Sequence, residues 1–187
     1  DSDVLTLAAG TNELTALNVE FITGSMSDDT LTLSNAQTGT YIDFQGGNDT
    51  LILNGVGNTV TVSNVEIITG GTGDDVVTLD TALTGGTIDL GSGNDTLNLV
   101  AGTNSLSAIN IETIVGTVFN DTLTITNALA AGTTIDLQGG NNTLVLNGVG
   151  NTVTVANTET IFGGTGDDVV TLATALDDSH IDLGDGH

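Results

Sequence analysis

The chain lacks basic residues: its 187 residues include no lysine and no arginine, against 24 aspartates and glutamates, for a formal net charge of −24 at pH 7. No carboxylate can therefore form a salt bridge with lysine or arginine. Charge of one sign opposes compaction and repels nucleic-acid phosphates, so we expect no nucleic-acid partner. Because 38% of the residues are hydrophobic, the chain can still bury a core if cations neutralise its acids.

Cysteine, proline and tryptophan are also absent. The lack of cysteine excludes thiolate metal sites, disulfides and cysteine catalysis, and it is compatible with an extracellular bacterial setting. No apolar run approaches the roughly 20 residues needed to cross a bilayer, so we expect no membrane span. No signal-peptide pattern opens the chain, although a signal outside this sequence or a C-terminal one stays open.

Glycine turns that close on an aspartate and lead into a strand are the most informative motif. Residues 70–78, GGTGDDVVT, fit the nonapeptide G-G-x-G-x-D-x-U-x, in which U is a large apolar residue, and a near copy spans 163–171. Glycine permits backbone angles that leave carbonyl oxygens pointing inward, and the aspartate adds a charged oxygen. Calcium prefers six to eight such hard oxygens.

Internal repeats extend this motif over the whole chain. Residues that begin each strand recur at spacings of 26, 20, 26, 20, 26, 21 and 26: Asp3, Asp29, Asp49, Asp75, Asp95, Asp121, Asn142 and Asp168. The spacings define four repeats, 3–48, 49–94, 95–141 and 142–187, within a single repeat domain, 1–187. We expect this domain to be part of a longer array.

Alternating apolar and polar residues, without a helical period, predict an all-β fold. We predict a parallel, β-roll-like β-solenoid of about eight coils that alternate between 26 and 20 residues. A 20-residue unit would hold two strands, and the longer unit would add a third strand-like piece and form a bulkier coil. In a less favoured arrangement, each 46-residue repeat forms one large coil. The residues expected to face the core are Leu51, Leu53, Val77, Leu79, Ile88, Leu90, Leu97 and Leu99.

Stacking of 20-residue coils would place equivalent residues about 4.8 Å apart. Asp75 would then lie close to Asp95, and Asp29 close to Asp49. Such an acidic ladder repels itself unless a cation lies between its rungs. We therefore predict that several calcium ions bind and that folding is coupled to their binding.

These motifs resemble RTX, or haemolysin-type, calcium-binding repeats over the whole chain. The nonapeptides carry the resemblance most strongly, with support from residues 88–97 and 110–124. The resemblance implies that carbonyls around Gly70, Gly71, Gly73, Gly91 and Gly93 share calcium with the carboxylates of Asp75 and Asp95. Residues 25–29 and 117–121 lack the glycines, and Asn142 replaces an aspartate, so these turns are expected to bind weakly or not at all.

Further residues complete the set of candidate metal ligands: Asp29, Gly47, Asp49, Asp74, Asp89, Asp121, Gly163, Gly164, Gly166, Asp167 and Asp168. Asp89 and its equivalents Asp43, Asp136 and Asp182 could instead be surface groups. Glu20, Glu66, Glu112 and Glu159 are expected to form a hydrogen-bonded polar ladder, with additional calcium ligands as the alternative. The simplest rival interpretation is that the turns are merely tight and their aspartates solvated.

No nucleophile with an adjacent base and no phosphate-binding loop occurs, and an active site would not recur in every coil, so we expect no enzyme. We predict a calcium-stabilised structural or adhesion solenoid that is secreted or lies on a bacterial cell surface, as part of a rod, filament or surface layer. Its partners would be further coils or copies stacked end to end. The alternatives are an ice-binding adhesin module, suggested by outward threonines, or a non-catalytic module of a secreted enzyme.

Overall fold

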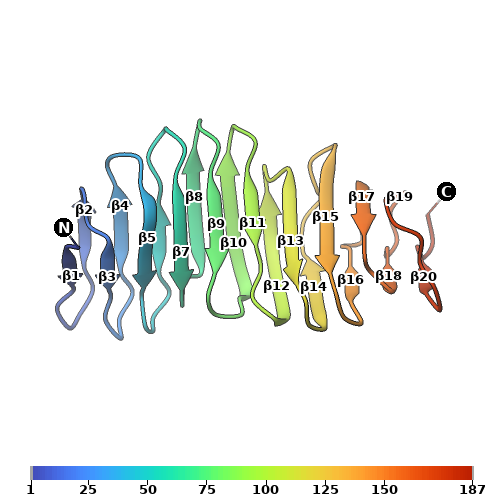
Figure 1. Ribbon diagram of the computed structural model, residues 1–187, viewed down its shortest axis with the longest axis horizontal. Coiled ribbons are helices and arrows are strands. Elements are labelled where there is room, and N and C mark those ends of the chain that lie inside the picture. The colour runs from blue at the N-terminus through green and yellow to red at the C-terminus, as the bar shows by residue number, and fades with distance from the viewer. Residues whose placement is uncertain (1, 187) are drawn as a thin grey trace.

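The computed structural model describes residues 2–186, which form twenty β-strands and no helix, and therefore no helix that could cross a membrane. Successive strands alternate between two parallel sheets of ten strands each, so the chain winds as a β-solenoid. Figure 1 shows the coils stacked in sequence order from the N-terminal to the C-terminal end. The predicted all-β parallel solenoid is confirmed.

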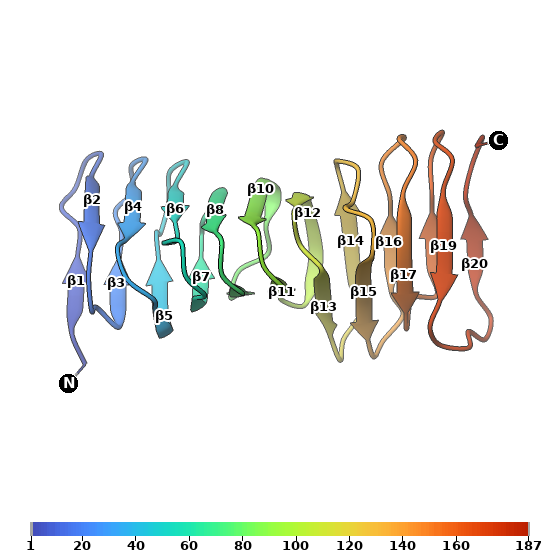
Figure 2. The same ribbon diagram turned by 90° about the horizontal axis from the view of Figure 1, so that it is seen from above.

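The odd-numbered strands form the first sheet: β1 (Val4–Thr6), β3 (Phe21–Thr23), β5 (Thr38–Asp43), β7 (Thr59–Ser63), β9 (Val76–Leu79), β11 (Thr96–Asn98), β13 (Thr113–Thr117), β15 (Thr133–Gln138), β17 (Thr152–Ala156) and β19 (Val169–Leu172). The even-numbered strands form the second sheet: β2 (Glu13–Ala16), β4 (Thr30–Leu33), β6 (Thr50–Ile52), β8 (Ile67–Gly71), β10 (Thr84–Gly91), β12 (Gly102–Ile109), β14 (Asp121–Ile125), β16 (Thr143–Val145), β18 (Thr160–Phe162) and β20 (His180–Asp182). Figure 2 shows the same stack from above.

The core lies between the two sheets and is built from the apolar positions of each alternating strand. In β4, for example, Leu31 and Leu33 are buried and the two threonines are half-buried. In-register pairing then stacks Leu31, Leu51 and Ile68 in one column. All eight residues that the alternation predicts to face the core are buried. Branched aliphatic side chains favour strands because they pack well on a pleated, half-buried surface.

The coil lengths differ from the prediction. Thr59 pairs with Val76, 17 residues later, and Val76 pairs with Thr96, 20 residues later. The 20-residue coil is confirmed, and the stack has about nine turns, close to the predicted eight, but the 26-residue unit is not a coil of its own. The 26-residue unit does contain three strands, but they make one and a half coils. The reason is that the corner at residues 64–66 is long enough to carry the chain from β7 in the first sheet to β8 in the second.

Each sequence repeat contains five strands: β1–β5, β6–β10, β11–β15 and β16–β20. Because five is odd, each repeat begins in the opposite sheet from the repeat before it. We call the side where the chain enters the second sheet the first edge, and the side where it enters the first sheet the second edge. Asp29 and Asp49 lie on the first edge, before β4 and β6, whereas Asp75 and Asp95 lie on the second edge, before β9 and β11.

Candidate metal centre

Acidic and amide side chains form hydrogen-bonded ladders inside the corners. On the second edge, the Asn58 N–H donates to Asp75 Oδ1 at 2.8 Å, and the Asp75 N–H donates to Asp95 Oδ1 at 2.7 Å. The Asp95 N–H in turn donates to Glu112 Oε2 at 2.9 Å. Each side chain therefore accepts a bond from the backbone of the preceding coil, which satisfies a buried N–H where the sheet ladder is interrupted.

The same ladder recurs on the first edge, where it connects Asn12, Asp29, Asp49 and Glu66. A third ladder, also on the first edge, runs from Gly102 through Asp121 and Asn142 to Glu159, and on the second edge Asn151 donates to Asp168. The predicted proximity of Asp75 to Asp95, and of Asp29 to Asp49, is confirmed. The glutamates form the expected polar ladder.

A second set of hydrogen bonds runs in the opposite direction just outside the first. The Asn94 N–H donates back to Asp74 Oδ1 in the preceding coil, at 2.9 Å. The neighbouring Asp75 N–H donates forward to Asp95 Oδ1. The pairs Asp28-Asp29, Asp74-Asp75 and Asn120-Asp121 therefore each give one bond to the next coil and receive one from it. Asp167 occupies the position beside Asp168 that Asp74 occupies beside Asp75.

Within residues 2–186, four buried carboxylate oxygens have no hydrogen-bond partner: the Oδ2 atoms of Asp49, Asp75, Asp95 and Asp168. The corresponding oxygens of Asp29 and Asp121 accept bonds from the backbone N–H groups of Ser25, at 2.9 Å, and Thr117, at 2.7 Å. In turns such as that of Asp95, the equivalent N–H, of Gly91, donates instead to Asp89 Oδ1 at 3.1 Å. Asp89 thus stabilises its own turn, and it also accepts a bond from Asn110.

The pKa values of Asp29, Asp49 and Asp95 reflect this difference in the hydrogen bonds that their carboxylates accept. Burial raises the pKa of the Asp49 and Asp95 carboxyls to about 6, and the neighbouring carboxylates add to the rise. Burial acts in the same direction on Asp29, but the bonds it accepts from Asn12 and Ser25 outweigh this effect and leave its pKa lowered. The charges of the Asp49 and Asp95 carboxylates are therefore poorly compensated within the ladder.

A backbone carbonyl lies near the unpartnered Asp168 carboxylate because the turns approach each other without side chains. A Cβ built on Gly163 would lie 2.5 Å from Asp168 Oδ2 and 2.7 Å from Leu183 O, the carbonyl of the next coil. A Cβ on Gly91, whose φ is +85°, would collide with Gly71 O. Glycine is therefore required at these positions, and it brings together the hard oxygens that calcium prefers.

The structure brings together some of the predicted ligands and separates others. The turn containing Gly70, Gly71, Gly73 and Asp74 packs against the turn containing Gly91 and Gly93. Gly47 packs against the backbone of residues 27–28 on the first edge, and Gly163, Gly164, Gly166 and Asp168 lie near the C-terminal end of the second edge. Within residues 2–186, no three His, Cys, Asp or Glu side chains gather at one point. A cation here would therefore take most of its ligands from backbone carbonyls.

The asparagines that begin three of the ladders were missed from the sequence: Asn12, Asn58 and Asn151. Each lies 17 residues before the acid that it contacts, as in Asn58 and Asp75, and each closing glutamate lies 17 residues after an acid or amide, as in Asp95 and Glu112. This spacing could have identified them, because it equals the shorter coil length.

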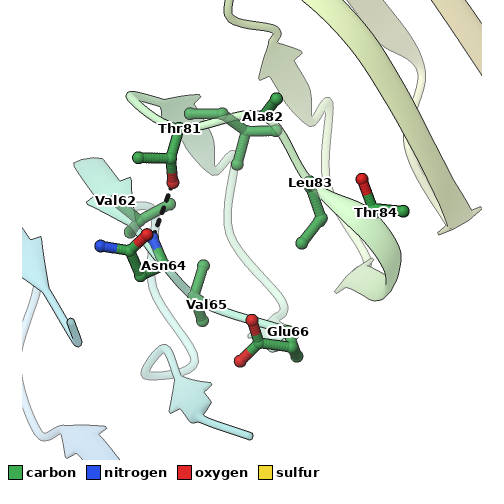
Figure 3. Close-up of a pocket in the computed structure, with 9 residues that line it drawn as sticks. Val62, Asn64, Val65, Glu66, Thr81, Ala82, Leu83 and Thr84 are labelled. Carbon is green, nitrogen blue, oxygen red and sulfur yellow. Dashed lines mark hydrogen bonds between the residues drawn. The ribbon is translucent and has the colours of Figure 1, made fainter. Parts of the chain in front are cut away.

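A cavity of about 210 Å³ marks the place where the first-edge ladder is interrupted after Glu66 (Figure 3). The Asn64 N–H donates to Thr81 Oγ1 at 2.7 Å across it, and Val65 and Leu83 supply apolar walls. Glu66 is the only carboxylate in the lining, and it already accepts the Asp49 N–H. The cavity therefore lacks the convergent charges of an ion site.

Comparison with known proteins gives no relative: no protein-family model, no curated protein and no solved structure matches this chain.

Proposed function

We propose that this chain is a calcium-binding β-solenoid with a structural or adhesive role and no catalytic activity. The observation that carries the proposal is the set of four buried, unpartnered carboxylate oxygens, in a chain without lysine or arginine. Burying an uncompensated carboxylate costs several kcal/mol, and a divalent cation would remove that cost. The resemblance of residues 70–78 and 163–171 to RTX nonapeptides agrees with this proposal.

An extracellular location follows from the same proposal. Extracellular modules that bind calcium need only weak sites, because calcium outside cells is abundant. Carbonyl-rich sites with few carboxylates belong to that class. We therefore propose that the solenoid is secreted or displayed on a bacterial cell surface.

Apolar side chains on the last coil suggest how the solenoid would be extended. Val169, Leu172 and Ile181 are all exposed there, although their equivalents in the central coils are buried or half-buried. We propose that further coils or another copy of the chain cover them, giving a rod or surface layer. Light scattering and electron microscopy in calcium would test this, and monomers that persist with no flanking coils in the gene would contradict it.

Circular dichroism during calcium titration tests the calcium proposal. When calcium is added to the chain in excess chelator, it should increase the β-sheet signal and raise the midpoint of thermal unfolding. A free calcium concentration of 100 times Kd stabilises the folded chain by about 2.7 kcal/mol per site. Magnesium should act more weakly, because it demands a smaller octahedral site and dehydrates reluctantly. A chain that is fully folded in chelator and unchanged by calcium would contradict the proposal.

Ice binding is a second candidate because one row of threonines is continuous. Thr96, Thr113, Thr134, Thr154 and Thr171 stack in register on the outer face of the first sheet. The row beside it is irregular, since it holds Asn98, Val115 and Asp136. Thermal hysteresis of the wild-type protein would favour this candidate, and its absence would remove it.

A further inference from the structure

Asn142 occupies the same structural position as Asp49 and Asp95. Each of the three accepts the N–H of the acid in the preceding coil at 2.7–2.9 Å and donates its own N–H to a glutamate in the next coil. Their surrounding backbones also agree: the residue four positions earlier has a φ of 61–85°, and the asparagine fifteen positions later has a φ of 50–51°. The three corners can therefore be compared atom by atom.

The side chain of Asn142 makes two contacts that a carboxylate cannot make. Its Nδ2 donates to the carbonyl of Leu137, five residues earlier, at 3.3 Å, and to the carbonyl of Asn157, fifteen residues later, at 2.8 Å. By the same offsets, Asp49 faces the carbonyls of Phe44 and Asn64, and Asp95 faces those of Leu90 and Asn110. In these two corners an oxygen replaces the amide nitrogen, and that oxygen is buried without a partner.

Three oxygens that converge without a donor repel one another, whereas a hard cation would bind all three. Three pairs of residues stack in adjacent coils at these corners, and they differ in how many carboxylate oxygens have no hydrogen-bond partner. The pair Asp75–Asp95 leaves two, and the pair Asp29–Asp49 leaves one, because Ser25 satisfies Asp29. The pair Asp121–Asn142 leaves none.

We propose that the three pairs differ in calcium affinity in this order: Asp75–Asp95 binds most tightly, Asp29–Asp49 more weakly, and Asp121–Asn142 not at all, because the Asn142 amide takes the place of the ion. This proposal rests on the proposed calcium function and adds to it a rank order of sites. At this corner the hydrogen bond from the Asn142 amide to the Asn157 carbonyl holds two coils together without metal.

Reciprocal substitutions test the proposal. Asn142→Asp exposes the Leu137 and Asn157 carbonyls to a carboxylate and should add one calcium ion per chain in equilibrium dialysis. Asp95→Asn keeps the acceptor for the Asp75 N–H but supplies an amide to the carbonyls, so it should remove the tightest site. Asp95→Asn should also show a stronger β-sheet signal than wild type in chelator.

Asp177→Asn is the matched control, since it removes one charge from an exposed residue outside the ladders. It should leave the calcium stoichiometry unchanged. If wild type binds calcium but Asn142→Asp binds no additional ion, or Asp95→Asn loses none, the rank order is wrong and the calcium function stands. If wild type binds no calcium, the calcium function and the rank order both fall.

Discussion

At the scale of single residues, the fate of one carboxylate oxygen distinguishes otherwise equivalent aspartates. Asp29 and Asp75 both accept an asparagine N–H and its side-chain amide on Oδ1. On Oδ2, Asp29 accepts the Ser25 N–H, whereas Asp75 accepts no bond. Whether the Oδ2 atom accepts a hydrogen bond therefore depends on the backbone N–H of the residue four positions before the aspartate.

The raised pKa values of Asp49 and Asp95 predict that the metal-free chain is more stable in mild acid. Their pKa is about 6 in the folded state, against the ordinary aspartate pKa of 3.8, so the folded state binds more protons than the unfolded state between these pH values. The stabilisation is present below the unfolded pKa and is lost as the pH rises through about 6. In chelator, the unfolding midpoint should be several degrees higher at about pH 5 than at about pH 7.5.

Lower pH also reduces the overall negative charge, so the test needs a control for that general effect. The double variant Asp49→Asn, Asp95→Asn removes the two titrating groups and keeps the ladder acceptors. Its midpoint should depend on pH less than that of wild type, as followed by circular dichroism. An equal dependence in both proteins would show that the two carboxyls are not responsible.

At the scale of elements, the glycine turns allow neighbouring coils to approach more closely than side chains would permit. Gly91 and Gly85 have nearly the same backbone angle, with φ of +85° and +80°. A Cβ on Gly91 would collide with the Gly71 carbonyl, whereas a Cβ on Gly85 would meet no atom within 4 Å. Alanine substitutions at Gly85 and Gly91 therefore distinguish the cost of backbone strain, which both share, from the cost of steric overlap between turns, which only Gly91 has.

Gly91→Ala should destabilise the chain much more than Gly85→Ala. Left-handed strain costs about 1–2 kcal/mol and applies to both, while overpacking adds about 1–3 kcal/mol at Gly91 only. Denaturant unfolding in saturating calcium would measure the difference. The same order should hold in chelator at about pH 5, where no ion contributes; equal losses would mean that the turns move apart at little cost.

At the scale of the whole molecule, two ladder-bearing edges concentrate negative charge along a narrow stack. The formal charge of −24 is spread over the coils without any lysine or arginine to offset it. Ladder carboxylates in adjacent coils are separated by roughly the strand spacing of about 4.8 Å, which is well inside the Debye length of about 8 Å at physiological salt. Self-repulsion is therefore a property of the whole stack.

Monovalent salt should partly replace calcium. In chelator, raising sodium chloride from about 0.05 M to about 0.5 M should increase the β-sheet signal and the unfolding midpoint, because it screens this repulsion. In saturating calcium the same change should have a much smaller effect, since bound ions already neutralise the closest pairs. Thermal unfolding across the salt series measures both, and an equally large salt effect in calcium would contradict neutralisation at the pairs.

The local pattern of the sequence was sufficient for the fold class, the core-facing residues and the contacts between aspartates 20 residues apart, because strand alternation and an exact repeat are properties of the chain itself. The 26-residue spacing could not be interpreted in the same way. Only the folded chain shows that residues 64–66 cross between sheets, which places successive aspartate pairs on opposite edges.

The tertiary structure also decided which carboxylate oxygens remain unsatisfied. In the sequence, the change from aspartate at position 49 to asparagine at position 142 looks like a simple loss of one charge. In the folded chain, the Asn142 amide donates to the Leu137 carbonyl of its own turn and to the Asn157 carbonyl of the next coil, so it links the two coils. Burial and partners depend on atoms that are distant along the chain. Sequence thus determined which residues line the edges, and packing determined which of them leave an oxygen without a partner.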